Sequence, residues 1–140
     1  MHDLARQCIR LGVRLPATDE TINAYVNDAI QYRMIPEQVV FYSINCYGTA
    51  DTIAFRRGKL RIHDYKSGVT RTSEMQLYVY AALFCLEYRI KPHEIETELR
   101  IYQSDEVRIY DAEPERILYI MDKIVTFDKY IEQMKLESLD

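Results

Sequence analysis

Apolar residues recur at helical spacing in four stretches of the chain, and each stretch predicts a helix. The predicted helices cover about residues 2–11, 18–33, 73–88 and 114–135. Thr18 or Asp19 is suited to cap the second helix, and Pro114 is suited to begin the fourth. The expected apolar stripe of the third helix consists of Met75, Val79, Ala82 and Leu86. The apolar positions of the fourth include Ile117, Ile120, Met121, Ile124, Phe127, Tyr130 and Ile131.

Runs of β-branched and aromatic residues predict five strands between these helices. The predicted strands cover residues 39–44, 48–55, 60–66, 96–103 and 107–110, and Pro36 breaks the pattern before the first. Arg56-Arg57-Gly58-Lys59 has the length and the glycine of a hairpin turn, and Ser104-Asp105-Glu106 is a second turn. This order predicts an α+β fold with a mixed central sheet flanked by helices.

Length and composition are typical of a globular protein. The 140 residues suit a single domain spanning 1–140, and hydrophobic residues make up 48% of the chain. No apolar run approaches the roughly 20 residues that span a membrane, and the N-terminus lacks the apolar stretch of a secretory signal. We therefore expect a cytoplasmic protein that has no membrane partner.

The three cysteines are odd in number and far apart. Cys8, Cys46 and Cys85 contain no C-x-x-C pair, so neither a disulfide framework nor a four-cysteine metal cluster is expected. We expect reduced thiols that line the core.

Charge is unevenly distributed along the chain. The formal net charge is −4, which does not favour a nucleic-acid binder. Six basic residues nevertheless face a single acid, Asp64, between positions 56 and 71: Arg56, Arg57, Lys59, Arg61, Lys66 and Arg71. Two interpretations stay open, namely a solvated hairpin tip and a local patch that faces phosphate groups.

Two carboxylates are expected to meet at one end of the predicted hairpin. Asp51 lies six residues before Arg57, and Asp64 lies six residues after Gly58, so the hairpin register brings them together. Side chains alternate across a strand, so Lys66 shares the face of Asp64. Adjacent carboxylates repel unless a cation lies between them, and Mg²⁺ accepts one or two carboxylates. The alternative is that Asp64 and Lys66 form a surface ion pair.

Further motifs surround this pair. The G-x-x-D segment Gly48-Thr49-Ala50-Asp51 precedes the D-x-K segment Asp64-Tyr65-Lys66, and Gln76 and Tyr80 follow at Q-x-x-x-Y spacing on a predicted helix. In this order the motifs resemble the signature of the RecB-family nucleases of the PD-(D/E)XK superfamily, especially small phage-encoded and CRISPR-associated exonucleases. The resemblance covers about residues 37–103, and His2 matches the histidine that precedes the other motifs. It implies a restriction-endonuclease-like αβββαβ core, here shortened at its N-terminus.

The resemblance also implies roles for individual residues. Asp51, Asp64, the Tyr65 carbonyl and His2 would bind Mg²⁺ or Mn²⁺, and Lys66 would orient or activate the attacking water. Gln76 and Tyr80 would brace the catalytic site and contact the nucleic acid, and Ser67 and Arg71 would contact phosphate groups. No iron–sulphur cluster is expected, because three scattered cysteines cannot supply four ligands. DNA would be the main partner, in replication, recombination or repair, with a homo-oligomer or a partner protein as further expectations.

Other polar residues are given ordinary structural interpretations. His63 should be packed or exposed on the face opposite Asp64, and His93 should face solvent. Glu37 is either an accessory acid or a surface glutamate, and tyrosines such as Tyr25, Tyr78, Tyr119 and Tyr130 are expected in the core. Two alternatives to a nuclease stay open: an inactive nucleic-acid-binding module with the same fold, and a metal-free interaction domain.

Overall fold

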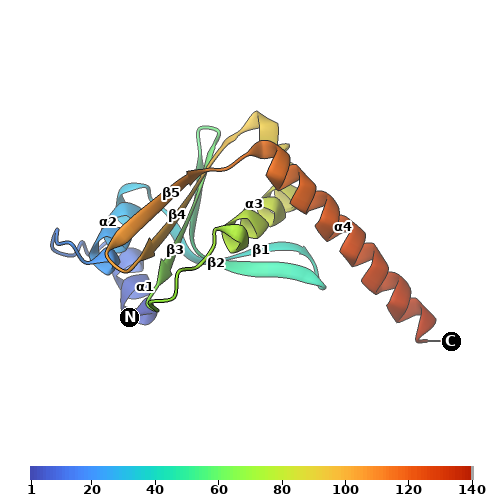
Figure 1. Cartoon of the computed structure of the whole chain (residues 1–140), viewed down its shortest axis with the longest axis horizontal. Helices are drawn as coiled ribbons and strands as arrows, with labels where there is room; N and C mark the ends of the chain where they lie inside the picture. Colours follow the sequence, from blue (N-terminus) through green and yellow to red (C-terminus); the bar gives the residue numbers. More distant parts are fainter. Residues whose placement is uncertain (140) are drawn as a thin grey trace.

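The structure, a computed structural model, describes residues 1–139 and contains helices on both faces of one sheet (Figure 1). Its α-helices are α1 (His2–Leu11), α2 (Thr21–Gln31), α3 (Met75–Tyr88) and α4 (Pro114–Glu137), and a 3₁₀ turn, η1, covers Pro92–Glu94. Its strands are β1 (Ile35–Ser43), β2 (Cys46–Arg56), β3 (Lys59–Lys66), β4 (Glu96–Gln103) and β5 (Glu106–Asp111).

The five strands form one mixed sheet in the order β1-β2-β3-β4-β5. The β3–β4 pair is parallel and the other three pairs are antiparallel. Parallel neighbours need a long crossover, which α3 supplies between β3 and β4. The predicted α+β fold with a mixed sheet and flanking helices is confirmed, and the segment from α2 to β4 has the order αβββαβ.

Each face of the sheet has its own core. Leu60, Ile62 and Leu99 pack beneath α3, whereas Tyr65 and Tyr102 pack against α1 and α2 on the opposite face. The alternation of side chains along β3 therefore directs neighbouring residues into different cores.

The predicted stripe on α3 is confirmed at Ala82, which is buried, and at Val79, which packs against the core, but it is wrong at Met75. Met75 is 46% exposed, whereas residues around most of the helix are buried, including Leu77, Tyr78, Ala81, Leu83 and Cys85. The reason is that α3 lies between the sheet and α4, so no single face distinguishes core from solvent.

Two predicted boundaries also need correction. Helix α2 begins at Thr21 with Glu20 at the N-cap, so neither Thr18 nor Asp19 caps it. Strand β1 begins at Ile35, so Pro36 lies inside a strand. An edge strand tolerates proline because the missing N–H can face away from the ladder.

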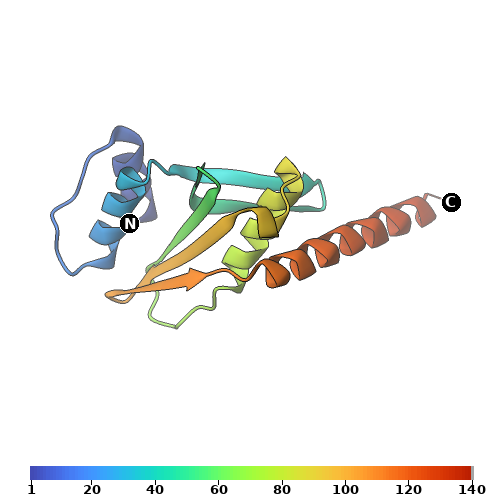
Figure 2. The ribbon, with the colours of Figure 1, turned by 90° about the horizontal axis from the view of Figure 1, so that it is seen from above.

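Most of α4 lies outside the core. Ile117 is its buried residue, and the helix projects away from the sheet (Figure 2). Among the tyrosines expected in the core, Tyr25 and Tyr78 are buried but Tyr119 and Tyr130 are exposed. An amphipathic sequence identifies an apolar face, but it does not provide a partner for that face.

The cysteines follow the prediction of free thiols. Cys8 and Cys85 are buried, and Cys46 is half-buried beside α4. None of the helices within residues 1–139 combines the length and the apolar character needed to cross a membrane.

Candidate functional site

The hairpin register brings Asp51 and Asp64 together, as the sequence predicted. Arg57 and Gly58 both have positive φ in the β2–β3 turn, and the ladder runs from the pair Arg56–Lys59 to the pair Thr52–His63. One further step in this register puts Asp51 opposite Asp64. Glycine adopts positive φ at little cost, so the turn residues help to set this register.

The site lies where two strands separate. Beyond Thr52, β2 continues to pair with β1, but its ladder with β3 ends. The carboxylate of Asp51 accepts a hydrogen bond of 3.0 Å from the Tyr65 backbone N–H, which lies just past the end of that ladder. Asp51 therefore satisfies a backbone donor while its carboxylate stays beside Asp64.

Burial and repulsion act together on Asp64. Its relative exposure is 3%, and its pKa is raised to about 7, first by burial and then by the neighbouring Asp51. Lys66 acts in the opposite direction, with its Nζ 3.1 Å from Oδ2 of Asp64. A cation between the two carboxylates would relieve the same repulsion.

Helix α3 supplies Gln76 and Tyr80 to this site. Lys66 Nζ donates to Gln76 Oε1 at 3.3 Å, so Lys66 connects Asp64 to the helix. Burial raises the pKa of Tyr80, and the charges of Asp64 and Asp51 raise it further. The spacing of four residues puts Gln76 and Tyr80 on one face of α3, as expected.

Gly48 allows Tyr80 to approach β2 closely. A Cβ atom at position 48 would lie 2.7 Å from Cε1 of Tyr80, well inside van der Waals contact. The glycine of the G-x-x-D segment therefore has a packing role, because a side chain there would displace Tyr80 from beside the carboxylates.

The N-terminal histidine reaches the site from the other side. His2 Nε2 donates to the Tyr65 carbonyl oxygen at 2.7 Å and lies 4.0 Å from Oδ2 of Asp51. The His2 ring also packs against the Tyr65 ring at 5.1 Å. Helix α1 has the predicted bounds, and its residues Ala5, Cys8 and Ile9 are buried, so His2 is carried on a packed helix.

The donor atoms suit a hard divalent cation. Within residues 1–139, no group of three or more His, Cys, Asp and Glu side chains is arranged to hold a metal ion. Mg²⁺ does not require such a group, because it binds through one or two carboxylates and keeps several waters. Asp51, Asp64 and the Tyr65 carbonyl provide oxygen donors of this kind, and His2 Nε2 is hydrogen-bonded to that carbonyl. The residues present therefore fit Mg²⁺ or Mn²⁺.

Ser67 and Arg71 lie in the loop after β3, and both are exposed. Arg71 Nη1 lies 3.7 Å from Oε2 of Glu106. Gln103, which the sequence did not single out, donates from Nε2 to the carbonyl oxygens of Gly68 and Thr70 at 2.8 Å each. It is the β4 residue paired with Lys66, so strand pairing positions this loop next to the site.

Glu37 shares a small cavity with Asp51. It lines a cavity of about 20 Å³ with His2, Asp51 and Arg6, and its Oε1 accepts from Arg6 Nη1 at 2.7 Å. Glu37 has a φ of 53°, an uncommon value for a residue other than glycine. Its side chain is a half-exposed partner of Arg6 at the rim of the site.

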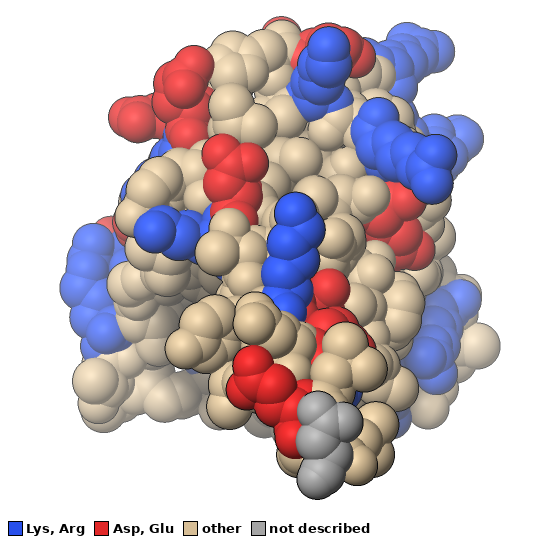
Figure 3. All heavy atoms as spheres, turned by 90° about the vertical axis from the view of Figure 1, so that its right-hand side faces the viewer, with Lys and Arg blue, Asp and Glu red and all other residues tan. Residues whose placement is uncertain are grey.

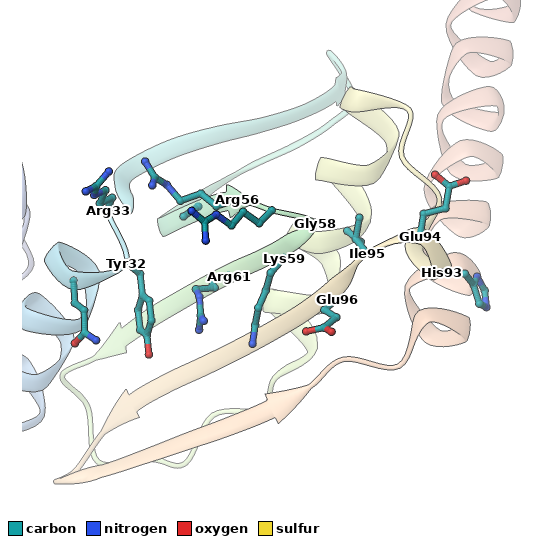
Figure 4. A pocket seen from close by; sticks show the side chains of 13 residues that line it. Tyr32, Arg33, Arg56, Gly58, Lys59, Arg61, His93, Glu94, Ile95 and Glu96 are labelled. Carbon is teal, nitrogen blue, oxygen red and sulfur yellow. The ribbon is translucent and has the colours of Figure 1, made fainter.

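The basic segment does not form one patch. Arg56, Arg57, Lys59 and Arg61 line a groove of about 1010 Å³ at the start of β3 (Figure 4). Lys66 lies at the other end of this strand, roughly 20 Å away at 3.3 Å per residue. Alternation also puts Lys59 and Arg61 on the face opposite Lys66. The basic residues of this segment can therefore form two separate phosphate-facing patches at most, one at each end of β3.

The other two histidines lie outside the carboxylate site. His63 is fully buried, and its Nδ1 lies 3.4 Å from the Tyr102 hydroxyl on the α2 side of the sheet. Burial lowers the pKa of His63. His93 is exposed and its Nε2 lies 2.7 Å from Oε1 of Glu115. Both positions agree with the sequence predictions.

Comparison with protein-family models and with curated proteins finds no match for this chain. A solved structure described as "Crystal structure of SSO0001" shares 13% sequence identity with it, at a TM-score of 0.38. The alignment covers 90% of this chain and 74% of that chain.

Proposed function

We propose that this protein is a metal-dependent nuclease that hydrolyses phosphodiester bonds in DNA. The observation that carries the proposal is the pairing of Asp51 with a buried Asp64 whose other neighbour is Lys66. Two carboxylates that can share one metal ion, with a lysine beside them, suit metal-assisted phosphoryl chemistry. The resemblance of the motifs to RecB-family nucleases favours an exonuclease that acts on ends or single strands, in the cytoplasm.

Each residue would have a separate task. A bound Mg²⁺ or Mn²⁺ would supply Lewis acidity and a more acidic water. Asp51, Asp64 and the Tyr65 carbonyl would hold the ion, with His2 beside them. The ammonium of Lys66 would orient the attacking water and stabilise negative charge as it develops on the phosphate. Gln76 restrains Lys66 through the hydrogen bond to its Nζ.

A second candidate is a nucleic-acid-binding module without catalytic activity. The hydrogen bond from His2 Nε2 to the Tyr65 carbonyl oxygen favours it, since this bond occupies two atoms that the resemblance assigns to metal binding. Both candidates predict DNA binding near Lys66, but only the nuclease predicts strand cleavage.

Labelled linear and circular DNA distinguish the two candidates. With Mg²⁺ or Mn²⁺, we expect linear DNA to be degraded from its ends, circular DNA to resist, and EDTA to stop the reaction. Binding of DNA without cleavage, under any of these ions, would support the inactive module. The absence of both binding and cleavage would contradict both candidates.

We expect DNA binding to depend on the loop after β3 and on α3. Replacement of Arg71 or Gln76 with alanine should weaken binding roughly 5-fold, which corresponds to about 1 kcal/mol for one hydrogen-bonded contact. Arg71→Ala should also reduce the slope of log affinity against log salt by about 1. Filter binding with an uncleaved substrate in Ca²⁺, over a salt series, measures both quantities.

Arg57→Ala and Lys129→Ala are the matched controls for this measurement. Arg57 is exposed at the opposite end of β3, and Lys129 is exposed on α4. Both remove one positive charge far from the site and should change affinity little. Equal or greater weakening in either control would mean that the nucleic acid does not lie across the carboxylate pair.

A further inference from the structure

The second half of α4 exposes large apolar side chains. Phe127 is 58% exposed, Tyr130 is 65% exposed and Met134 is 55% exposed. The helix carries these residues beyond the edge of the sheet, as two views show (Figures 1 and 2). Contiguous apolar surface of this kind is uncommon on a monomer and marks interaction sites.

The exposed face includes an apolar hollow. Cys46, Ile120, Ile124, Phe127 and Tyr130 line a depression of about 630 Å³ beside the β1–β2 turn. Lys123 and Thr126 also line it. A hollow next to protruding aromatic side chains can receive the side chains of another helix.

Contacts with the rest of the protein fix which face of α4 points outward. Asp128 accepts hydrogen bonds from Ser43 Oγ at 2.5 Å and from Asn45 Nδ2 at 2.9 Å. Lys135 Nζ donates to Asn45 Oδ1 at 2.6 Å. These bonds hold one side of the helix against the β1–β2 turn, so the side that carries Phe127 and Tyr130 stays exposed.

Charges at the two ends of this face have opposite signs. Lys123 and Glu137 lie seven residues before and after Tyr130, and seven residues make almost two helical turns, so the three align. Neither Lys123 nor Glu137 forms an ion pair within the part of the chain that the structure describes. Lys123 extends over the Tyr119 ring, and Glu137 accepts from Gln133 at 3.4 Å.

From this pattern we infer that the second half of α4 pairs antiparallel with α4 of a second copy of the chain. With the two-fold axis at Tyr130, Lys123 of each copy faces Glu137 of the other. Phe127 of each copy then lies next to Met134 of the other, because 127 and 134 are nearly symmetric about 130. Every contact away from the axis forms twice in such an interface, so the attractive charge pairs are doubled.

The charge of the surface favours a second copy over a polyanion or a membrane. Lys and Arg are interspersed with Asp and Glu on the side of the molecule that α4 points toward (Figure 3). The second half of α4 carries both signs, with Asp128, Glu132 and Glu137 against Lys129 and Lys135. A helix that lies on a membrane or on nucleic acid carries mainly Lys and Arg on its polar side.

Sedimentation velocity over a concentration series tests the pairing. We expect the wild type to sediment as a dimer, and Tyr130→Glu to raise the dissociation constant by about 10-fold or more, since two like charges would meet at the axis. Leu118→Glu, on another side of α4, is the matched control and should stay dimeric. A wild type that is monomeric throughout, or a dimer unaffected by Tyr130→Glu, would overturn the inference.

Charge reversal tests the antiparallel arrangement separately. Lys123→Glu and Glu137→Lys should each weaken the dimer, because each places like charges together twice. The double variant restores both opposite-sign pairs and should regain most of the affinity. If the double variant is no tighter than the single variants, the two helices do not pair in this register. This test is independent of nuclease activity.

Discussion

Replacement of Lys66 with alanine should reduce DNA cleavage about 100-fold or more while DNA binding changes little, since its proposed action is on water and on transition-state charge. Its Nζ lies 3.1 Å from Asp64 Oδ2 and 3.3 Å from Gln76 Oε1, so it is held at the site. Single-turnover cleavage with saturating enzyme measures the effect separately from binding.

Lys59→Ala is the control for this experiment. Lys59 begins the same strand, its side chain is as exposed as that of Lys66, and it also lies near a carboxylate, Glu98. The Lys59→Ala variant should cleave DNA at the wild-type rate. If Lys66→Ala also cleaves at that rate, Lys66 is only the ion-pair partner of Asp64 and the catalytic assignment is wrong.

Loss of Lys66 also acts indirectly through Asp64, and this effect must be distinguished from the loss of the ammonium itself. Lys66 lowers the pKa of Asp64, so its removal should raise that pKa further. An activity that recovers as the pH is raised would mean that Lys66 acts through the charge of Asp64. An activity that stays low at every pH supports a direct role for its ammonium.

Asp51→Asn and Asp64→Asn should each weaken Mn²⁺ binding by about 100-fold or more. This loss exceeds the one typical of residues that only hydrogen-bond a metal-binding side chain and do not bind the metal themselves. Isothermal titration calorimetry of the metal alone measures this without a substrate. Asp105→Asn makes the same change in the exposed β4–β5 turn and should bind Mn²⁺ as the wild type does. Wild-type protein that binds no Mn²⁺ would remove the basis for the nuclease proposal.

Thermal unfolding of Asp64→Asn provides a check on folding and on the electrostatics. The pKa of Asp64 is raised from 3.8 to about 7, so the folded state holds its proton more tightly than the unfolded state. The metal-free wild type should therefore lose stability as pH rises between these two values, and the loss should level off above the higher one. Asp64→Asn lacks this charge. The difference between its melting temperature and that of the wild type should therefore grow in favour of the variant over the same pH range. A variant with unchanged pH dependence would contradict a buried, repelled carboxylate.

Local sequence determined the elements and the hairpin that forms the site. Arg57-Gly58 adopts the positive φ values of a tight turn, and strand pairing counted outward from it brings Asp51 and Asp64 together. The Gln76–Tyr80 spacing put both residues on one helical face, and β4 has the predicted bounds. These features depend on residues close in sequence, whose geometry the backbone itself restricts.

Tertiary structure decided what covers each face and which distant segments meet. His2 contacts Tyr65 across 63 positions of sequence because α1 packs on α2, and no periodicity encodes that contact. Lys59 and Lys66 belong to one basic segment of the sequence. The alternation of side chains along β3 nevertheless puts them on opposite faces of the sheet. Helical spacing of apolar residues predicted one apolar face on each of α3 and α4. In the structure, however, α3 is buried nearly all round and α4 exposes Tyr130. A periodic sequence specifies which residues share a face, but only packing determines whether another part of the chain covers it.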